Sequence, residues 1–452
     1  MNSKDDVVQA IRDLDTKSIK FGVTDIDGVL RGKVISTEKF LSALEHGIGF
    51  CNVIFGWDVN DACYDNSVVS GWHTGYPDSI STIDPNSMRL IPWEDNRPFF
   101  IGDFSNAPDL QNVCPRNLLK KIIQELATEG LTPKIGAEFE WYNFDESPQS
   151  LHYKDFQNLN PLTPGMFGYS IFRASINSAY VNDLFEFLHE FEIPLEGIHT
   201  ETGDGVYEAC IAYSDALESA DRAALFKTAV KEIASKHELV TSFMAKWNAD
   251  LPGCGGHLHQ SLWNADSSKN LFYDEEHPQK LSPLFESYIA GQLHCLPYIL
   301  PLYAPTINSY NRFVEGTWAA TTVSWGIDNR TTALRVINQK EQSMRLETRV
   351  PGADANPYLS IAASLASGLY GIKNNLKLEV PLTTGNEYQN KNAVGLPSDL
   401  HKATQAMKNS EIPKALFGEE FVDHFVRTRE WEWRQYNPQQ SDWELKRYFE
   451  II

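Results

Sequence analysis

The sequence predicts an α+β fold in which strands and amphipathic helices mix along the whole chain. Residues 19–35 alternate apolar and polar side chains on both sides of Asp27-Gly28, a turn-forming pair that indicates a β-hairpin. Residues 4–16 and 115–129 carry apolar side chains at helical spacing, and Gly130 follows the second segment as a helix stop. Both kinds of element therefore belong to one globular chain.

The elements between and beyond these segments follow from local composition. Residues from about 50 to 80 are rich in Gly, Asp, Asn and Ser, which is typical of a long loop, and residues 81–93 return to strand character. The pattern changes to helix near residue 110, so we expect an N-terminal domain of residues 1–110 and a second domain of residues 111–452. Strands and helices alternate through the second domain.

Composition limits the class of protein. The 452 residues with 42% hydrophobic content are enough for a large core and for one to three domains. A net charge of −21 disfavours nucleic acid and anionic membranes as partners. The chain begins without an apolar signal core and has no run of about 18 apolar residues, so we expect a cytoplasmic protein without a membrane span. The six cysteines lack CxxC spacing, which disfavours zinc ribbons and a disulfide framework.

Three short segments, residues 135–141, 256–260 and 344–350, place charged or imidazole side chains at every second position. Residues two apart in a strand share one face, so these side chains should line one surface while the apolar residues pack on the other. Carboxylates and imidazoles beside arginines suit two divalent cations that hold a nucleotide phosphate and an anionic substrate. The side chains are those of Glu138, Glu140, His257, His259, Arg345, Glu347 and Arg349.

Glu201 and Glu208 bracket a turn-forming segment that can bring their two carboxylates together. A single glutamate is most often a solvated surface charge, and the two histidines could be core residues. Glu138, Glu140 and Glu208, however, lie among apolar and aromatic neighbours, which indicates buried strands. Buried carboxylates require cations or many hydrogen-bond donors. The set as a whole therefore favours metal ligation over a surface role.

Five arginines within 38 residues form a second group. Arginine captures carboxylate or phosphate with two parallel hydrogen bonds and stays charged when buried. Any one of them could instead form a surface ion pair, but few acids lie between them. The cluster, which indicates an anion site, consists of Arg312, Arg330, Arg335, Arg345 and Arg349.

With these motifs, the chain resembles the glutamine synthetase family over nearly its whole length. The paired-glutamate strands, the histidine segment of the ATP site and the arginine segments follow one another in the order of that family. Seven ordered motifs carry the resemblance: residues 136–140, 201–208, 255–262, 308–314, 328–335, 345–349 and 356–359.

The resemblance implies an N-terminal β-grasp domain and a catalytic domain in which helices surround a curved antiparallel sheet, a half-barrel. It also implies a homo-oligomer of stacked rings whose active sites are shared between subunits. ATP would activate the carboxylate of glutamate as an acyl phosphate with two or three Mg²⁺ or Mn²⁺ ions, and an amine would then displace phosphate.

The resemblance also assigns residues. Those for the metals are Glu140, Glu201 and Glu208 for one ion, and Glu138, His257 and Glu347 for the other. Those for the nucleotide are His259, Ser261, Arg335 and Arg345. Glutamate would be held by Gly253, Arg312 and Arg349, and the transferring phosphoryl group would be stabilised by Arg330.

One departure from the family concerns the attacking amine. Glutamine synthetases place a catalytic glutamate, which binds ammonium and removes its proton, six residues after the arginine equivalent to Arg312. This chain has Trp318 there. Tryptophan cannot accept a proton, but it offers an apolar wall or a cation–π face. Glu315 is a candidate substitute for the lost base, and the plain alternative is that Trp318 only packs.

Other departures fall in loops. The family's ammonium pocket takes an aspartate from the N-terminal loop of the neighbouring subunit, and either Asp58 or Asp61 matches it. Tyr169 matches a position that forms another wall of the amine site in the family. Val394 stands where adenylylated members have tyrosine, so that control is absent, and Pro252 replaces an asparagine in the loop that closes over glutamate.

We therefore predict an ATP-dependent ligase that joins the γ-carboxylate of glutamate to an organic amine through γ-glutamyl phosphate and opens an amine catabolic pathway. An alkylamine or arylamine is the first choice because of the tryptophan, and a polyamine is the second because of the acidic charge. The alternatives are an ordinary glutamine synthetase that uses ammonium and a catalytically inactive binding or structural relative.

Overall fold

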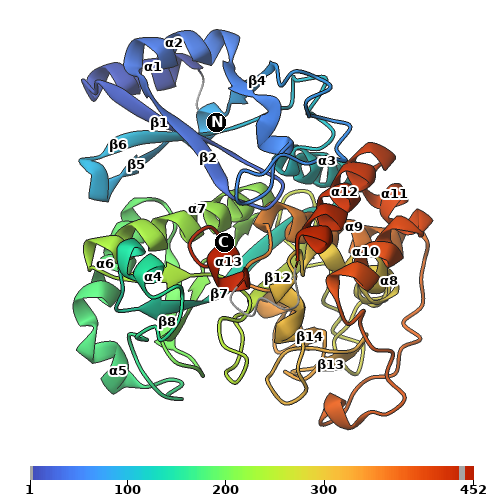
Figure 1. The fold of residues 1–452 in the computed structure, drawn as a ribbon. Coiled ribbons are helices and arrows are strands. Elements are labelled where there is room, and N and C mark those ends of the chain that lie inside the picture. The colour runs from blue at the N-terminus through green and yellow to red at the C-terminus, as the bar shows by residue number, and fades with distance from the viewer. Residues whose placement is uncertain (1–3, 437–442) are drawn as a thin grey trace.

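The N-terminal part of the chain forms a mixed sheet with two helices on one side (Figure 1). The computed structural model describes residues 4–436 and 443–452. The strands run in the order β2-β1-β6-β4-β3, with β5 beside β6, and β1 is parallel to β6, which fits the expected β-grasp arrangement. The elements are α1 (Lys4–Asp13), β1 (Ser18–Thr24), β2 (Leu30–Ser36), α2 (Thr37–His46), β3 (Ile48–Cys51), β4 (Asp78–Ile83), β5 (Arg89–Ile91) and β6 (Arg97–Asp103).

The predicted hairpin is confirmed as β1 and β2, which pair antiparallel. Gly28 has a φ of +85° in the connecting turn, a conformation that strains other residues. The predicted first helix ends earlier than expected, at Asp13. The segment from 50 to 80 is mostly irregular, and residues 81–93 contain the end of β4 and all of β5.

A second, larger sheet forms the curved half-barrel. Its strands run in the order β13-β14-β15-β12-β7-β9-β8, with β10 and β11 also beside β7, and every pair is antiparallel except β13 with β14. The strands are β7 (Thr132–Phe144), β8 (Leu195–Thr200), β9 (Val206–Ile211), β10 (Ser214–Asp215), β11 (Val240–Ser242), β12 (Gly256–Trp263), β13 (Trp325–Ile327), β14 (Leu334–Ile337) and β15 (Arg345–Thr348).

Helices surround this sheet (Figure 1). Helix α3 starts at Pro115 as predicted, and both α3 and α7 pack on β7, while α8 and α9 pack against each other. The helices are α3 (Pro115–Thr128), α4 (Pro148–Tyr153), α5 (Ile171–Ile176), α6 (Ser178–Glu190), α7 (Ala216–Lys236), α8 (Pro283–Ile299), α9 (Pro357–Lys373), α10 (Leu400–Lys408), α11 (Glu411–Phe417), α12 (Glu419–Gln435) and α13 (Trp443–Tyr448). None of the helices described is both long enough and apolar enough to cross a membrane.

The central strand β7 separates the core from the site. Phe139 and Trp141 are buried on one face, where Phe139 stacks on Phe226 at 5.8 Å between ring centroids and Trp141 lies 6.0 Å from Phe243. The alternate residues, Glu138 and Glu140, point away from this aromatic core, because successive side chains of a strand point to opposite faces. Burial of the aromatic face therefore fixes the direction of both carboxylates.

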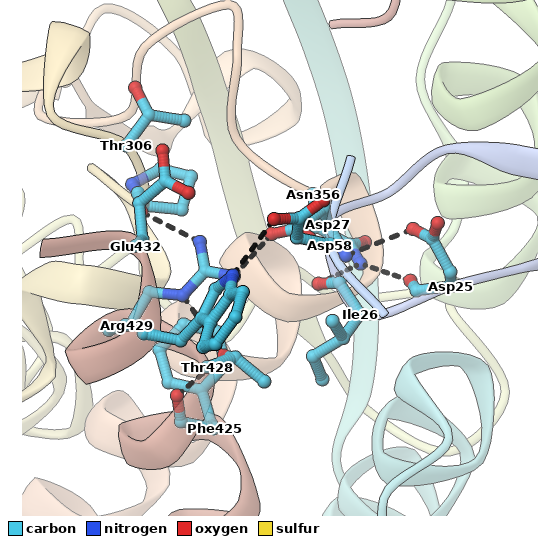
Figure 2. Close-up of polar contacts among 12 residues, drawn as sticks. Asp25, Ile26, Asp27, Asp58, Thr306, Asn356, Phe425, Thr428, Arg429 and Glu432 are labelled. Atoms are coloured by element: carbon cyan, nitrogen blue, oxygen red, sulfur yellow. Dashed lines mark hydrogen bonds and ion pairs between the residues drawn. The ribbon is translucent and has the colours of Figure 1, made fainter. Parts of the chain in front are cut away.

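A buried polar network joins the N-terminal sheet to the C-terminal helices (Figure 2). The turn between β1 and β2 carries Asp27, which accepts a hydrogen bond from Arg429 of α12. The side chain of Asn356 donates to the carbonyl oxygens of Asp25 and Ile26, each at 3.2 Å. Since Arg429 is only 3% exposed, removing either partner of its ion pair would leave a buried charge unpaired.

Candidate active site

The register of the second sheet brings the charged segments together. His257 on β12 lies opposite Glu138 on β7, with 3.0 Å between Nδ1 and a carboxylate oxygen. On the other edge of β12, His259 lies opposite Glu347 of β15, and Glu347 lies opposite Arg335 of β14. The prediction that the three segments are strands with one charged face is confirmed.

The second pair of glutamates lies on the other side of β7. Glu208 on β9 is opposite Glu140 and also opposite His199 on β8. His199 approaches Glu201 at 3.6 Å and Glu208 at 3.7 Å. The sequence analysis missed His199, although it lies two residues before Glu201 and so follows the same every-second-position pattern.

These side chains line a cavity of about 450 Å³, called the catalytic cavity below. A second cavity of about 400 Å³, called the inner cavity, adjoins it and shares Glu138, Cys210, Arg330 and Arg335. The predicted residues on the catalytic cavity are Glu138, Glu140, Tyr169, Glu201, Glu208, Gly253, His257, Trp318, Arg330, Arg335, Glu347 and Arg349. Those on the inner cavity include His259, Ser261 and Arg345.

Four candidate residues lie outside both cavities. Arg312 is 4% exposed, donates to the carbonyl oxygen of Val350 and packs behind Gly253, where a Cβ would come within 2.7 Å of its Cγ. Glu315 is exposed on the loop before Trp318. Asp58 is 3% exposed and accepts from Arg447 at 2.7 Å and from Trp431 at 2.8 Å, whereas the side chain of Asp61 is 58% exposed.

The acids of the catalytic cavity differ strongly in proton affinity. Burial, together with the negative charges of Glu138 and Glu140, raises the pKa of Glu208 to about 10. Burial alone would also raise the pKa of Glu138, but hydrogen bonds and positive charge from His257 and His259 lower it well below its usual value. Desolvation and repulsion both oppose several ionised carboxylates in one cavity, so the cluster favours binding of cations.

The arginines meet the carboxylates at β15. Glu347 is 1% exposed and accepts from Arg349 at 2.6 Å and from Arg335 at 2.8 Å. Burial alone would raise the pKa of Glu347, but the positive charges of Arg349, His259 and His257 bring it down to about 2. Arg345 donates to His259 Nδ1 at 3.1 Å, so the arginine and histidine of the inner cavity orient one another.

The donor atoms are suitable for divalent cations. Ligand atoms within 4.8 Å of one another form three groups, which are Glu138 with Glu208 and Cys210, Glu138 with His259 and Glu347, and His199 with Glu201 and Glu208. Glu140 lies beside the last group, with its carboxylate accepting from Gly255 N at 2.8 Å. Oxygen donors with an occasional imidazole suit Mg²⁺ and Mn²⁺. The groupings differ from the predicted triplets in including His199, His259 and Cys210.

Two aromatic residues form the open side of the catalytic cavity. Trp318 is 57% exposed and has a φ of +65°, which is rare for a bulky side chain. Its carbonyl oxygen accepts a hydrogen bond from Arg349 at 3.4 Å. Tyr169 is 67% exposed and lies against His199 with 4.4 Å between ring centroids. An apolar group in this cavity would therefore contact aromatic surface next to the metal-ligand groups.

Comparison with known proteins agrees with this geometry. Residues 112–448 match the family model for the glutamine synthetase catalytic domain. The chain is 51% identical over its whole length to type-1 glutamine synthetase 2 of Dictyostelium discoideum, covering 87% of that protein. It is 38% identical to the glutamate–isopropylamine ligase of a Pseudomonas species, covering 96% of this chain and 95% of the relative.

Among solved structures, a complex of GmaS with ADP superposes with a TM-score of 0.84 at 27% identity and covers 98% of each chain. The fold, the arrangement of acidic and basic side chains and the sequence matches lead to one conclusion. This chain belongs to the glutamine synthetase family.

Proposed function

We propose that this protein is an ATP-dependent ligase that joins the γ-carboxylate of glutamate to an organic amine. Trp318 carries the proposal, because it puts an aromatic wall on the catalytic cavity at the position where the family resemblance expects a proton-accepting glutamate. The relative named glutamate–isopropylamine ligase, which is similar over nearly all of both chains, supports an amine with an apolar body.

Members of the family use ATP and divalent metal ions. In this chain the carboxylates of Glu138, Glu140, Glu201, Glu208 and Glu347, with the histidines between them, would hold two or three such ions. Bound there, the ions would neutralise charge on the phosphoryl oxygens.

The arginines would bind the negatively charged groups of ATP and glutamate. Arg335 and Arg345, with His259 and Ser261, would contact the nucleotide phosphates in the inner cavity, and Arg330 lies where the two cavities meet, in position to contact a phosphoryl group in transit. Arg349 and Gly253 would hold glutamate from the lining of the catalytic cavity, and Arg312, buried behind Gly253, would support that lining and add positive charge. The γ-carboxylate takes the phosphoryl group and ADP leaves. The amine nitrogen then attacks the carbonyl carbon, the bond to phosphate breaks and a proton is released.

The acceptor of that proton differs from the family pattern, because tryptophan has no basic atom. We propose that rings of subunits, working in the cytoplasm, bring the loop after residue 55 of one subunit to the site of the next. Exposure favours Asp61 over Asp58 for this contact. The side chain of Asp61 is 58% exposed beside its ion pair with Arg31, whereas Arg447 and Trp431 occupy the buried Asp58 carboxylate.

The division into an N-terminal domain of residues 1–110 and a catalytic domain of residues 111–452 is part of the same proposal, supported by the two separate sheets.

The second candidate is an ordinary glutamine synthetase. The 51% identical relative named type-1 glutamine synthetase 2 favours it. The discriminating experiment measures phosphate release with ATP, Mg²⁺ and glutamate in the presence of ammonium or single organic amines, and records the masses of the products. We expect kcat/KM to be far higher with an apolar amine, and equal or faster turnover of ammonium would establish the second candidate.

A catalytically inactive relative is the remaining alternative. Ligands that bind only the folded state raise the melting temperature. We expect Mg²⁺ with ATP to stabilise the protein, and the absence of both stabilisation and phosphate release would favour the inactive relative.

A further inference from the structure

A further cavity of about 430 Å³ lies on the far side of Trp318, and we call it the side cavity. It shares Trp318 and Arg330 with the catalytic cavity, so these two residues form the border between them. Its apolar lining comes from the indole of Trp318, from Ile327 at the end of β13 and from Leu382, and Thr384 is exposed at its rim.

The outer wall of the side cavity is held in place by hydrogen bonds to β13, to the loop after β13 and within the wall itself. Trp325 Nε1 donates to the carbonyl oxygen of Val380 at 2.7 Å, and the side chain of Asn329 donates to that of Gly385 at 2.8 Å. Glu387, 2% exposed, accepts from Thr383 at 2.8 Å. A wall with these attachments keeps the cavity formed without a ligand.

The backbone around Trp318 is fixed as well. Arg349 donates to its carbonyl oxygen, and the hydroxyl of Tyr388 donates to that of Ala319 at 2.9 Å. A bulky residue persists at a φ of +65° only when its surroundings determine it, and such positions gather at ligand sites. The backbone from which the indole projects is therefore fixed at the border of the two cavities.

The charges at this border disfavour a second ammonium group. The guanidinium of Arg330 is exposed there. Asp328 is the nearest acid of the lining, but one of its oxygens already accepts from Arg335 Nε at 2.9 Å and Nη2 at 2.5 Å. A cationic tail would therefore meet the positive charge of Arg330 and a carboxylate whose charge Arg335 already offsets.

We propose that the side cavity receives the body of the amine substrate, so that the enzyme selects monoamines with an extended apolar body over small amines and polyamines. The inference rests on the proposed ligase function and narrows its substrate class. A methylene group takes up about as much space as a water molecule, roughly 30 Å³. The cavity therefore has ample room for the chain of pentylamine or hexylamine.

The first test is a series of n-alkylamines from methylamine to hexylamine, assayed for phosphate release with product masses. Burial of one methylene favours binding by about fourfold, so partial burial should raise kcat/KM about two- to threefold for each carbon added. Pentylamine and 1,4-diaminobutane have the same number of heavy atoms, and we expect pentylamine to be at least about tenfold better. A flat series, or a better diamine, would overturn the proposal.

The second test fills the cavity from its rim. Thr384→Trp should lower the ratio of kcat/KM for pentylamine to that for methylamine about tenfold, and Thr384→Lys should lower it as well because it adds a charge. Thr128→Trp, at the exposed end of α3, is the matched control and should keep the wild-type ratio. An unchanged ratio in both Thr384 variants would refute the inference while the ligase function stood. Phosphate release with ammonium but with none of the organic amines would instead refute the proposed glutamate–amine ligase function itself.

Discussion

Replacing Trp318 by alanine would remove the aromatic wall of the catalytic cavity. The tryptophan is 57% exposed, and a whole tryptophan side chain has an area of up to about 250 Å². About 140 Å² is therefore open to solvent, and an amine body covering half of it would bury about 70 Å². At about 25 cal/mol per Å² this contact contributes about 1.8 kcal/mol, equivalent to about 20-fold in kcat/KM.

The assay compares Trp318→Ala and Trp318→Phe with the wild type, using phosphate release with pentylamine and with ammonium. We expect the alanine variant to lose about 20-fold with pentylamine and the phenylalanine variant to lose less, while ammonium, which has no apolar body, is affected far less. Melting temperatures should stay close to the wild type, because more than half of the side chain is exposed. An alanine variant that keeps its kcat/KM with pentylamine would refute the assignment of the indole to the amine.

Three further predictions concern carboxylates. Asp58→Asn should lower the free energy of unfolding by about 2 kcal/mol in urea denaturation, since Arg447 loses one buried carboxylate partner and keeps the other, Glu432. Exposed Asp61→Asn should change it by less than about 0.5 kcal/mol. Burial beside other acids raises the pKa of Glu208 from 4.5 to about 10, so the folded state binds more protons than the unfolded state between these two pH values. With metal ions removed by EDTA, the free energy of unfolding should therefore fall as the pH rises through this range. Mg²⁺ displaces that proton, so the melting temperature gained with Mg²⁺ should grow from about pH 6 to about pH 8, and Glu208→Gln should abolish the growth. Glu315→Gln should change kcat by less than about twofold, since its side chain is exposed outside both cavities; a loss near 100-fold would make it the missing base.

The parts of the fold with local signals could be predicted from the sequence. Alternation identified β7, β12 and β15, and the Asp27-Gly28 turn identified the first hairpin. Helix α2 was missed although it carries its own signals, with Ser36 capping the backbone N–H of Lys39 and Gly47 after the last turn. The pattern that identified Glu138 and Glu140 would also have identified His199, had it been applied to β8.

Contacts between distant segments had no local signal. The burial of Asp58 depends on Arg447, almost 400 residues further along the chain, and the sequence of the loop around Asp58 does not indicate that partner. The side cavity likewise forms only when the segment around Leu382 is tied to β13. The sequence therefore identified Trp318 as unusual, but it could not show that a second cavity lies behind it.

The pairing of β7 with β12 has a consequence for how this scaffold can change. Shifting β7 by one residue would turn Glu138 toward the buried face of the sheet, and shifting β12 would do the same to His257. Neither strand therefore tolerates an insertion. The loops that carry Trp318 and Leu382 are outside this pairing and can vary in length and side chains while the strands stay in place. Redesign toward a new amine should therefore exchange these two loops together and leave all the strands that activate glutamate untouched.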